Sequence, residues 1–387
     1  MQQTKINTMS KTMPKKKQKI ITREIVPLKS QKMTNLINNY IKENYKTTPS
    51  RNEINEIKDA LHSYTQEYMK TYTLNLRVAE YKGNFYIDMT NKAGQAIVMS
   101  KNGWDIINEP PTIMFRKNKN QLPIIKPSPA GIGNAKLLLK YVNLPEGDKK
   151  TEIMYLTTAI TTWVPNIDSM GNNIWGVEGS QKTSTMQYTK RVFDPSIMEI
   201  MRLPKDVDEL KRQLNDNYLI PYDNISYLSQ SHSDEICSAM TGIASDKRKL
   251  YTDEETIVKA YKRKFMMNGI VQAAIYPDLA QRFNSIEVAP ATTLKKKTDM
   301  DKEFKKDLPD IIGGISDTIC RAIEIYPTLE GKIYLHRMAD FSQWGCAIAI
   351  ALGYTKEDFE TALKNKDTEQ ITDSLNNNPL ASVIMEL

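Results

Sequence analysis

Residues 176–185 have the sequence Gly-Val-Glu-Gly-Ser-Gln-Lys-Thr-Ser-Thr, and this stretch decides the fold class of the chain. It follows the pattern Gly, four residues, Gly, Lys, then Ser or Thr at Gly176, Lys182 and Thr183. Glycines let backbone N–H groups close around phosphates, and the N-terminus of a following helix adds a favourable dipole. The stretch therefore predicts a phosphate-binding loop, or P-loop, that leads into a helix.

The side chains of this loop fit a nucleoside triphosphate bound with Mg²⁺. Lys182 is expected to neutralise the β- and γ-phosphates, and Thr183 to hold Mg²⁺. Gln181 stands where the pattern has its second glycine, and a side chain there crowds the loop or demands a different backbone angle. The alternative is a Gly/Ser turn before a helix. The residues expected to contact the nucleotide are Gly176, Gly179, Ser180, Gln181, Lys182, Thr183 and Ser184.

Residues 218–224 read as an apolar strand that ends in an acid, which is the metal-side partner of a P-loop. Asp223 is expected to contact Mg²⁺ through water. Asn224 stands where many such ATPases place a water-activating Glu, and an Asn can orient a water but cannot take its proton. Pro221 would remove a ladder donor from a strand expected to be central. The alternative is an ordinary edge strand followed by a turn.

Two further stretches carry candidate catalytic residues. Residues 264–270 read as a strand with Asn268 at its end, where the amide could bond the γ-phosphate or the attacking water. A turn-forming Asn-Gly is the alternative. In residues 277–282, Arg282 could reach the γ-phosphate of a neighbouring subunit, and the alternative is a surface Arg paired with Asp278.

The order of these four stretches suits successive strand–helix units of one sheet. Short apolar strands alternate with helical segments from residue 172 to about residue 290, which predicts an α/β fold with a three-layer core. The expected organisation is a basic flexible tail (1–32), a helical segment (33–72), a strand-rich module (73–130), a helical connection (131–165), the P-loop core (166–294), a helical lid region (295–363) and a polar C-terminal tail (364–387).

Composition sets limits on the class of protein. The 387 residues are 40% hydrophobic and 26% charged, which is ordinary for a globular protein, and no apolar run is long enough to cross a bilayer. The three scattered cysteines suit a reducing, cytoplasmic setting and give no zinc pattern. Residues 1–32 contain nine basic residues and one acid, so the net charge of +7 belongs to this tail. The tail either binds polyanions without reading sequence or is a disordered solubilising leader.

Together these features resemble the ATP-binding proteins of phages, plasmids and integrative elements, which are related to superfamily-three replicative helicases and often accompany a primase. The resemblance covers roughly residues 80 to 355. The stretches that carry it are 85–88, 103–111, 115–116, 176–185, 222–226, 250–253, 267–270, 277–282 and 337–341.

The resemblance implies an AAA+-like P-loop domain, often a hexameric ring, with motor activity on DNA. It implies that Lys182 and Thr183 bind phosphate and Mg²⁺, and that Asp223 serves the metal. It also implies that Asn268 senses the γ-phosphate and that Arg282 is an arginine finger. An Asp-Asn after the second strand is common in this group.

These implications give a main hypothesis and two alternatives. The main hypothesis is an ATP-dependent DNA motor with ATP and Mg²⁺ as cofactors. Its expected partners are single-stranded or forked DNA, further copies in a ring and a separate primase, with no membrane contact. One alternative is a nucleotide switch or scaffold with little or no hydrolysis. The other is a DNA-binding replication initiator with a degenerate P-loop.

Three features stay open between a functional and a structural role. Asp234 or Glu235 could supply the missing base, or could lie on a solvated helix N-terminus. Arg337 could be a lid residue that touches phosphate, or could pair with Asp340. The basic residues 262–264 could line a DNA channel or form a solvated face.

Overall fold

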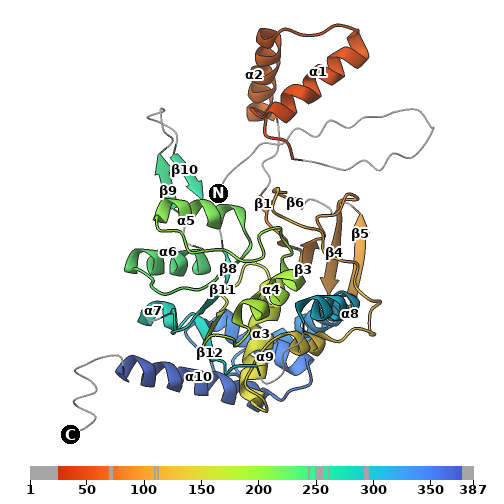
Figure 1. Cartoon of the computed structure of the whole chain (residues 1–387). Helices are drawn as coiled ribbons and strands as arrows, with labels where there is room; N and C mark the ends of the chain where they lie inside the picture. Colours follow the sequence, from red (N-terminus) through yellow and green to blue (C-terminus); the bar gives the residue numbers. More distant parts are fainter. Residues whose placement is uncertain are drawn as a thin grey trace.

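The computed structural model describes residues 25–68, 73–108, 110, 113–242, 245–248, 256–259, 262–274, 276–291 and 296–376, and of residues 245–248, 256–259, 367 and 369–376 only the backbone. A parallel sheet carries helices on both sides, and a helical hairpin projects from the N-terminal side (Figure 1). Most of the basic tail and the stretch 250–253 lie outside the described residues.

The central sheet consists of parallel strands in the order β12-β7-β11-β8. These strands are β7 (Gly171–Trp175), β8 (Leu219–Tyr222), β11 (Lys264–Gly269) and β12 (Phe283–Glu287). Parallel neighbours need crossover connections, which are usually helical. Here the connecting segments contain α4 (Lys182–Phe193), α5 (Val207–Asp216), α6 (Gln230–Thr241) and α7 (Pro277–Ala280). Although β11 follows β8 in the chain, it lies between β7 and β8, so the strand with Asn268 sits in the middle of the site.

Side chains along β11 alternate between two hydrophobic cores. Phe265 and Met267 belong to the core that includes Leu210 of α5 and Ile236 of α6. Met266 belongs to the other core, on the side of α4 and of α3 (Lys149–Ile160). The sheet is therefore covered on both faces, which confirms the predicted three-layer α/β core.

Pro221 does not lie in a central strand, contrary to the expectation from sequence. It belongs to β8, at the edge of the sheet. The C=O of Pro221 accepts a hydrogen bond from the N–H of Met201 at 2.9 Å, on the side away from β11. The N–H and C=O of one strand residue point to the same side, so an N–H at Pro221 would also face away from β11. The proline therefore removes no bond from the β8–β11 ladder.

The N-terminal part contains a helical hairpin and an antiparallel sheet. The hairpin is α1 (Gln31–Tyr45) and α2 (Arg51–Tyr68), and the sheet order is β2-β3-β4-β5. Its strands are β2 (Val78–Tyr81), β3 (Asn84–Asp88), β4 (Gln95–Ser100) and β5 (Gly103–Asn108), and β1 (Leu74–Asn75) pairs with β6 (Met114–Phe115). The expected helices and strands of this region are present.

The C-terminal part is helical, as predicted, but one segment differs from the expectation. The elements are η1 (Ala135–Tyr141), η2 (Thr161–Trp163), α8 (Lys297–Ile325), η3 (Tyr326–Leu329), α9 (Ala339–Ala351) and α10 (Lys356–Asn376). Of the polar tail expected at 364–387, residues 364–376 continue α10, whose preceding part buries Phe359, Ala362 and Leu363 at helical spacing.

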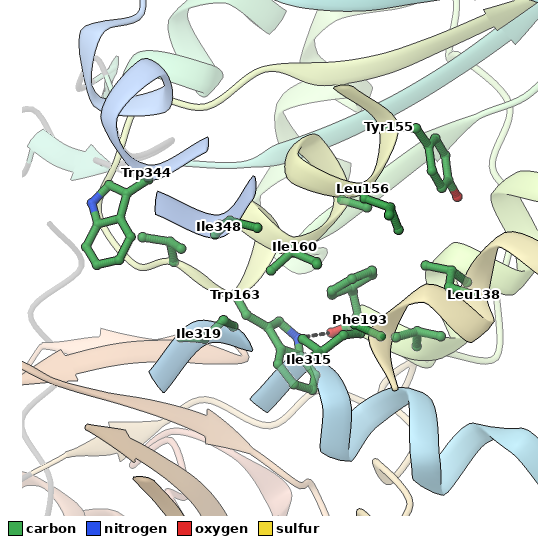
Figure 2. Close-up of a cluster of buried hydrophobic side chains, with 14 of the residues drawn as sticks. Leu138, Tyr155, Leu156, Ile160, Trp163, Phe193, Ile315, Ile319, Trp344 and Ile348 are labelled. Atoms are coloured by element: carbon green, nitrogen blue, oxygen red, sulfur yellow. Dashed lines mark hydrogen bonds between the residues drawn. The ribbon is translucent and has the colours of Figure 1, made fainter. Parts of the chain in front are cut away.

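A hydrophobic core joins the helical region to the sheet domain (Figure 2). Trp163, at the end of η2, is fully buried, and its indole N–H donates to the C=O of Phe193 at 2.8 Å. Ile315 of α8 and Ile348 of α9 belong to the same cluster. The end of α4 is thus packed directly against the C-terminal helices.

A buried ionic cluster joins the N-terminal sheet to the P-loop core. Arg77 donates to Asp194 at 2.7 Å, and Lys190 donates to the same carboxylate at 2.7 Å. Asp194 also accepts from the N–H of Leu219, at the start of β8. All three charged side chains are at most 3% exposed. Burial alone would raise the pKa of Asp194, but the charges of Lys190 and Arg77 outweigh it and lower the pKa to about 2.

Among the residues that the structure describes, no helix is long and apolar enough to span a membrane.

Candidate nucleotide-binding site

The candidate residues meet at the carboxyl ends of β7, β8 and β11. The loop 176–181 follows β7, Asp223 follows β8, and Asn268 lies at the end of β11. The strands are parallel, so their carboxyl ends lie along one edge, which is where open α/β sheets bind ligands. The strand order then brings together three side chains from distant parts of the sequence.

The backbone of the loop has the positive φ angles of a tight anion-binding turn. Gly176 has φ +146°, and a Cβ there would collide with the C=O of Val288. Gly179 has φ +80°. Gln181 has φ 54° and ψ 23°, the left-handed conformation, at the residue that precedes α4. Gln181 therefore adopts the angles that favour glycine at this position, and the side chain does not prevent the turn.

Lys182 begins α4 and folds back across the loop. Its ammonium donates to the C=O of Gly176 and of Val177, both at 2.7 Å, and to the hydroxyl of Ser180 at 3.2 Å. Burial lowers the pKa of Lys182, and the carboxylates of Glu178 and Asp223 oppose this shift. These contacts hold the cation against the loop that precedes α4.

Thr183, Asp223 and Asn268 form one hydrogen-bonded group. The hydroxyl of Thr183 donates to Oδ1 of Asp223 at 2.8 Å, and the amide of Asn268 donates to the same oxygen at 2.6 Å. The N–H of Asn224 donates to Oδ1 of Asn268 at 2.6 Å. The side chain of Asn224 is exposed, and its φ is 54°. The chain thus places the two predicted metal ligands and the predicted γ-phosphate sensor within hydrogen-bond distance of one another.

The chemistry of this group suits Mg²⁺ and a triphosphate. A hydroxyl and a carboxylate are hard oxygen ligands, and Mg²⁺ commonly takes one or two protein oxygens with the rest from phosphates and water. Within the described ranges, no group of three or more His, Cys, Asp or Glu is arranged to hold a metal. A metal at Thr183 and Asp223 would therefore depend on phosphate oxygens, as a nucleotide-bound Mg²⁺ does.

Arg282 is not brought to this group within one chain. It precedes β12 at the amino edge of the sheet, where its C=O accepts from Gly171 at the start of β7. A five-residue strand spans ~17 Å, so a whole strand separates it from the loop. Arg282 is 9% exposed, and its guanidinium lies 3.3 Å from the carboxylate of Asp278. The pairing with Asp278 is the one foreseen as the structural alternative.

The other open residues also have partners away from the loop. Arg337 contacts Asp278, not Asp340, and donates to Gln281 at 2.7 Å. Asp234 accepts from Gln230, and Glu235 lies 3.5 Å from Lys211. These partners of the two acids thus lie outside the group of Thr183, Asp223 and Asn268.

The basic residues 262–264 do not form a free surface. Lys262 pairs with Asp168 at 2.6 Å, and Arg263 donates to the C=O of Leu214 at 2.5 Å. Lys264 is buried and donates to Ser169 at 2.6 Å.

Two features of the site region were missed from the sequence. The hairpin of β9 (Ser245–Arg248) and β10 (Thr256–Lys259) lies between α6 and β11 and projects from the domain (Figure 1). Alternation in this stretch is weak, and charged residues interrupt it. The second is Asn143, which contacts the loop from the segment before α3. Its Val-Asn-Leu-Pro context carries no motif.

The fold is similar to that of a solved helicase structure. The solved structure of SCCmec type IV Cch, titled an active helicase, aligns with 90% of this chain and 70% of its own at a TM-score of 0.50 and 10% identity. The apo C-terminal region of NrS-1 aligns with 60% of this chain and 66% of its own, with a TM-score of 0.36 and 13% identity. No curated protein matches the sequence.

The family model of the actinomycete integrative conjugative element replication protein matches residues 135–365. The match covers more than half of the chain, from η1 through the sheet domain to α10. This protein belongs to that family of mobile-element replication proteins, and the resemblance inferred from the sequence is confirmed.

Proposed function

We propose that this replication protein is an ATP-dependent DNA motor with ATP and Mg²⁺ as cofactors. The observation that carries the proposal is the hydrogen-bonded group of Thr183, Asp223 and Asn268 beside Lys182. The family and the helicase fold support DNA as the polymer on which it acts.

Each residue of the group has a role in this proposal. Lys182 exchanges the loop carbonyls for the β- and γ-phosphates, and Thr183 and Asp223 hold Mg²⁺. Asn268 bonds the γ-phosphate, and Asn224 orients the attacking water. The loop contacts to phosphate come from Gly176, Gly179, Ser180, Gln181 and Ser184.

The cation for the γ-phosphate would come from another copy of the chain. Arg282 lies at the far edge of its own sheet, so it could act as a finger only on a neighbour's nucleotide, which requires a homo-oligomeric ring. A mass measurement with ATP and DNA tests this point, and a monomer would rule out Arg282 in that role. We place primase activity on a separate protein.

The deciding experiment is steady-state ATP hydrolysis with and without single-stranded DNA. We expect DNA-stimulated turnover in the wild type and its loss, by at least ~100-fold, in Lys182→Ala, since the lysine stabilises the developing charge on phosphate. Lys205→Ala, at an exposed lysine of the same domain, is the matched control and should keep wild-type turnover. Wild-type turnover in Lys182→Ala would refute the proposal.

A nucleotide switch is the second candidate, and Asn224 favours it. The proposed water-orienting residue has no carboxylate, and the nearby acids Asp234 and Glu235 contact other residues. ATP binding without turnover, in the presence of DNA, would establish the switch. Failure to bind any nucleotide would instead favour a DNA-binding initiator with a degenerate P-loop.

A further inference from the structure

Asn143 holds the P-loop from outside the sheet. It lies between η1 and α3, and its side-chain amide donates to the C=O of Ser180 and to the C=O of Ala289, both at 2.9 Å. Its backbone N–H donates to the hydroxyl of Thr185, in the first turn of α4, at 3.0 Å. One residue thus ties together the loop, the following helix and the segment after β12.

The contact with Ser180 fixes the direction of one peptide group in the loop. In a trans peptide, the C=O of one residue and the N–H of the next point in opposite directions. Because the C=O of Ser180 points to Asn143, the N–H of Gln181 must point away from it. A flip of this peptide would turn a carbonyl, instead of an N–H, to that side of the loop. A carbonyl oxygen repels phosphate, whereas an N–H donates to it.

We call the two hydrogen bonds from the Asn143 amide to Ser180 and Ala289 the clamp. The segment after β12 gives this clamp a fixed support. The N–H of Val288 donates to the C=O of Trp175 at 2.9 Å, and the C=O of Val288 leaves no room for a side chain at Gly176. Ala289, the second acceptor of the Asn143 amide, is the next residue. Asn143 therefore fastens the second half of the loop to the same segment that already packs against its first residue.

We propose that Asn143 is a positioning residue that keeps the peptide between Ser180 and Gln181 in the orientation that binds phosphate. The inference rests on the proposed nucleotide site. It assigns Asn143 no contact with the nucleotide and no part in proton transfer.

The first test measures the loop without nucleotide. In Asn143→Ala, we expect amide hydrogen exchange in peptides that cover residues 176–185 to rise on the order of tenfold, since two loop-anchoring hydrogen bonds are lost. Asn120→Ala is the matched control, because Asn120 also joins two segments, by donating to Asn217 and accepting from Met198, away from the loop. It should leave exchange in residues 176–185 unchanged. Unchanged exchange in Asn143→Ala would overturn the proposal.

The second test measures ATP affinity with Mg²⁺ by calorimetry. Asn143→Ala should bind ATP on the order of tenfold more weakly than the wild type, with KM raised more than kcat is lowered. Asn143→Gln keeps the amide donors and should recover part of the affinity. Asn143→Asp has the same shape but sets a carboxylate against two carbonyls, so it should bind no better than Asn143→Ala.

These outcomes separate the clamp from the proposed function. Faster exchange in the loop of Asn143→Ala together with no ATP binding by the wild type would support the clamp and refute the nucleotide site. Wild-type affinity in Asn143→Ala and Asn143→Asp would refute the positioning role while leaving the nucleotide site standing. Should Asn143→Ala fail to fold, the comparison between wild type and Asn143→Gln still decides, and equal affinity would refute the role.

Discussion

Lys264 is a residue whose position the sequence could not reveal. It follows two other basic residues, a pattern that suits a DNA channel or a solvated face. The structure buries it at the amino end of β11, where Ser169 accepts from its ammonium. Burial lowers its pKa to about 7, with a further contribution from the charge of Lys262. The ammonium of Lys264 is therefore buried and does not belong to a solvated face.

The depressed pKa of Lys264 predicts a pH dependence of stability. Its folded pKa lies below its unfolded value of 10.5, so between about pH 7 and pH 10 the unfolded state binds more protons and stability rises with pH. Lys264→Met should lack this contribution. As the pH rises through this range, the unfolding free energy of the wild type should therefore increase relative to that of Lys264→Met by up to ~1.4 kcal/mol per pH unit. Urea unfolding at pH 7, 8 and 9 measures it, and parallel pH profiles would contradict the assignment.

Among single residues, those within the motifs were predictable and those outside were not. Thr183, Asp223 and Asn268 lie together because Asp223, Asn268 and the loop before Thr183 lie at the carboxyl ends of parallel strands, which the sequence order already implied. The location of Arg282 depended on which end of β12 it flanks, and the motif does not carry that information. Asn143 acts through its side-chain amide on backbone carbonyls, an interaction available to any Asn and visible only in three dimensions.

At the scale of elements, the P-loop before α4 departs from the nucleotide-binding pattern at one residue, because Gln181 replaces its second glycine. Gln181 takes the left-handed conformation of the missing glycine. For a residue with a Cβ this conformation costs ~1 kcal/mol or more. The departure from the pattern is therefore a strained version of the same turn.

This strain predicts that Gln181→Gly stabilises the protein. The variant removes the strain of the left-handed conformation, but glycine also has more conformational entropy in the unfolded state. The net gain in unfolding free energy should be up to ~1 kcal/mol. ATP affinity should be kept or improved. Thermal unfolding and calorimetry measure the two effects. Gln187→Gly, inside α4, is the matched control and should lose ~1 kcal/mol. Equal losses in both variants would contradict the conformation of Gln181.

Elements with a clear pattern of apolar residues could be predicted from the sequence, whereas elements that bury only a few apolar side chains could not. The strands β8 and β11 are nearly continuous apolar runs, as a sheet covered on both faces requires. In α10 the apolar positions are few, and much of the helix is charged. The expectation for Pro221 was wrong because it assumed that the strand is central, where a proline would remove a ladder hydrogen bond. The position of β8 at the edge follows only from the order of all four strands.

At the scale of the whole molecule, the charged cluster around Asp194 connects the N-terminal sheet to the P-loop core. Arg77 comes from the segment before β2, Lys190 from the end of α4, and Asp194 also receives the first N–H of β8. The guanidinium of Arg77 additionally donates to the C=O of Asp88 at 2.9 Å and of Pro195 at 3.0 Å. The cluster therefore reaches both the helix that begins at Lys182 and the strand that ends before Asp223.

Removing one member of this cluster should be far more damaging than removing a surface charge. Arg77→Ala leaves the carboxylate of Asp194 buried with one cation fewer, and should lose ~3–5 kcal/mol of unfolding free energy. Arg212→Ala breaks the exposed pair with Glu209 and should change it by less than ~1 kcal/mol. Denaturant unfolding of the two variants measures the contrast, and similar losses would show that the buried pair is not special.

The arrangement around Asp194 also constrains how the sequence can change over generations. Replacing Asp194 leaves two cations in the interior without a counter-ion. Replacing Arg77 or Lys190 leaves buried hydrogen-bond acceptors without their donor, so each one-step path passes through a destabilised intermediate. The three positions should therefore be inherited as a unit. Aligned relatives that keep this contact between the two sheets should carry all three charges, and relatives that lack one should lack the set.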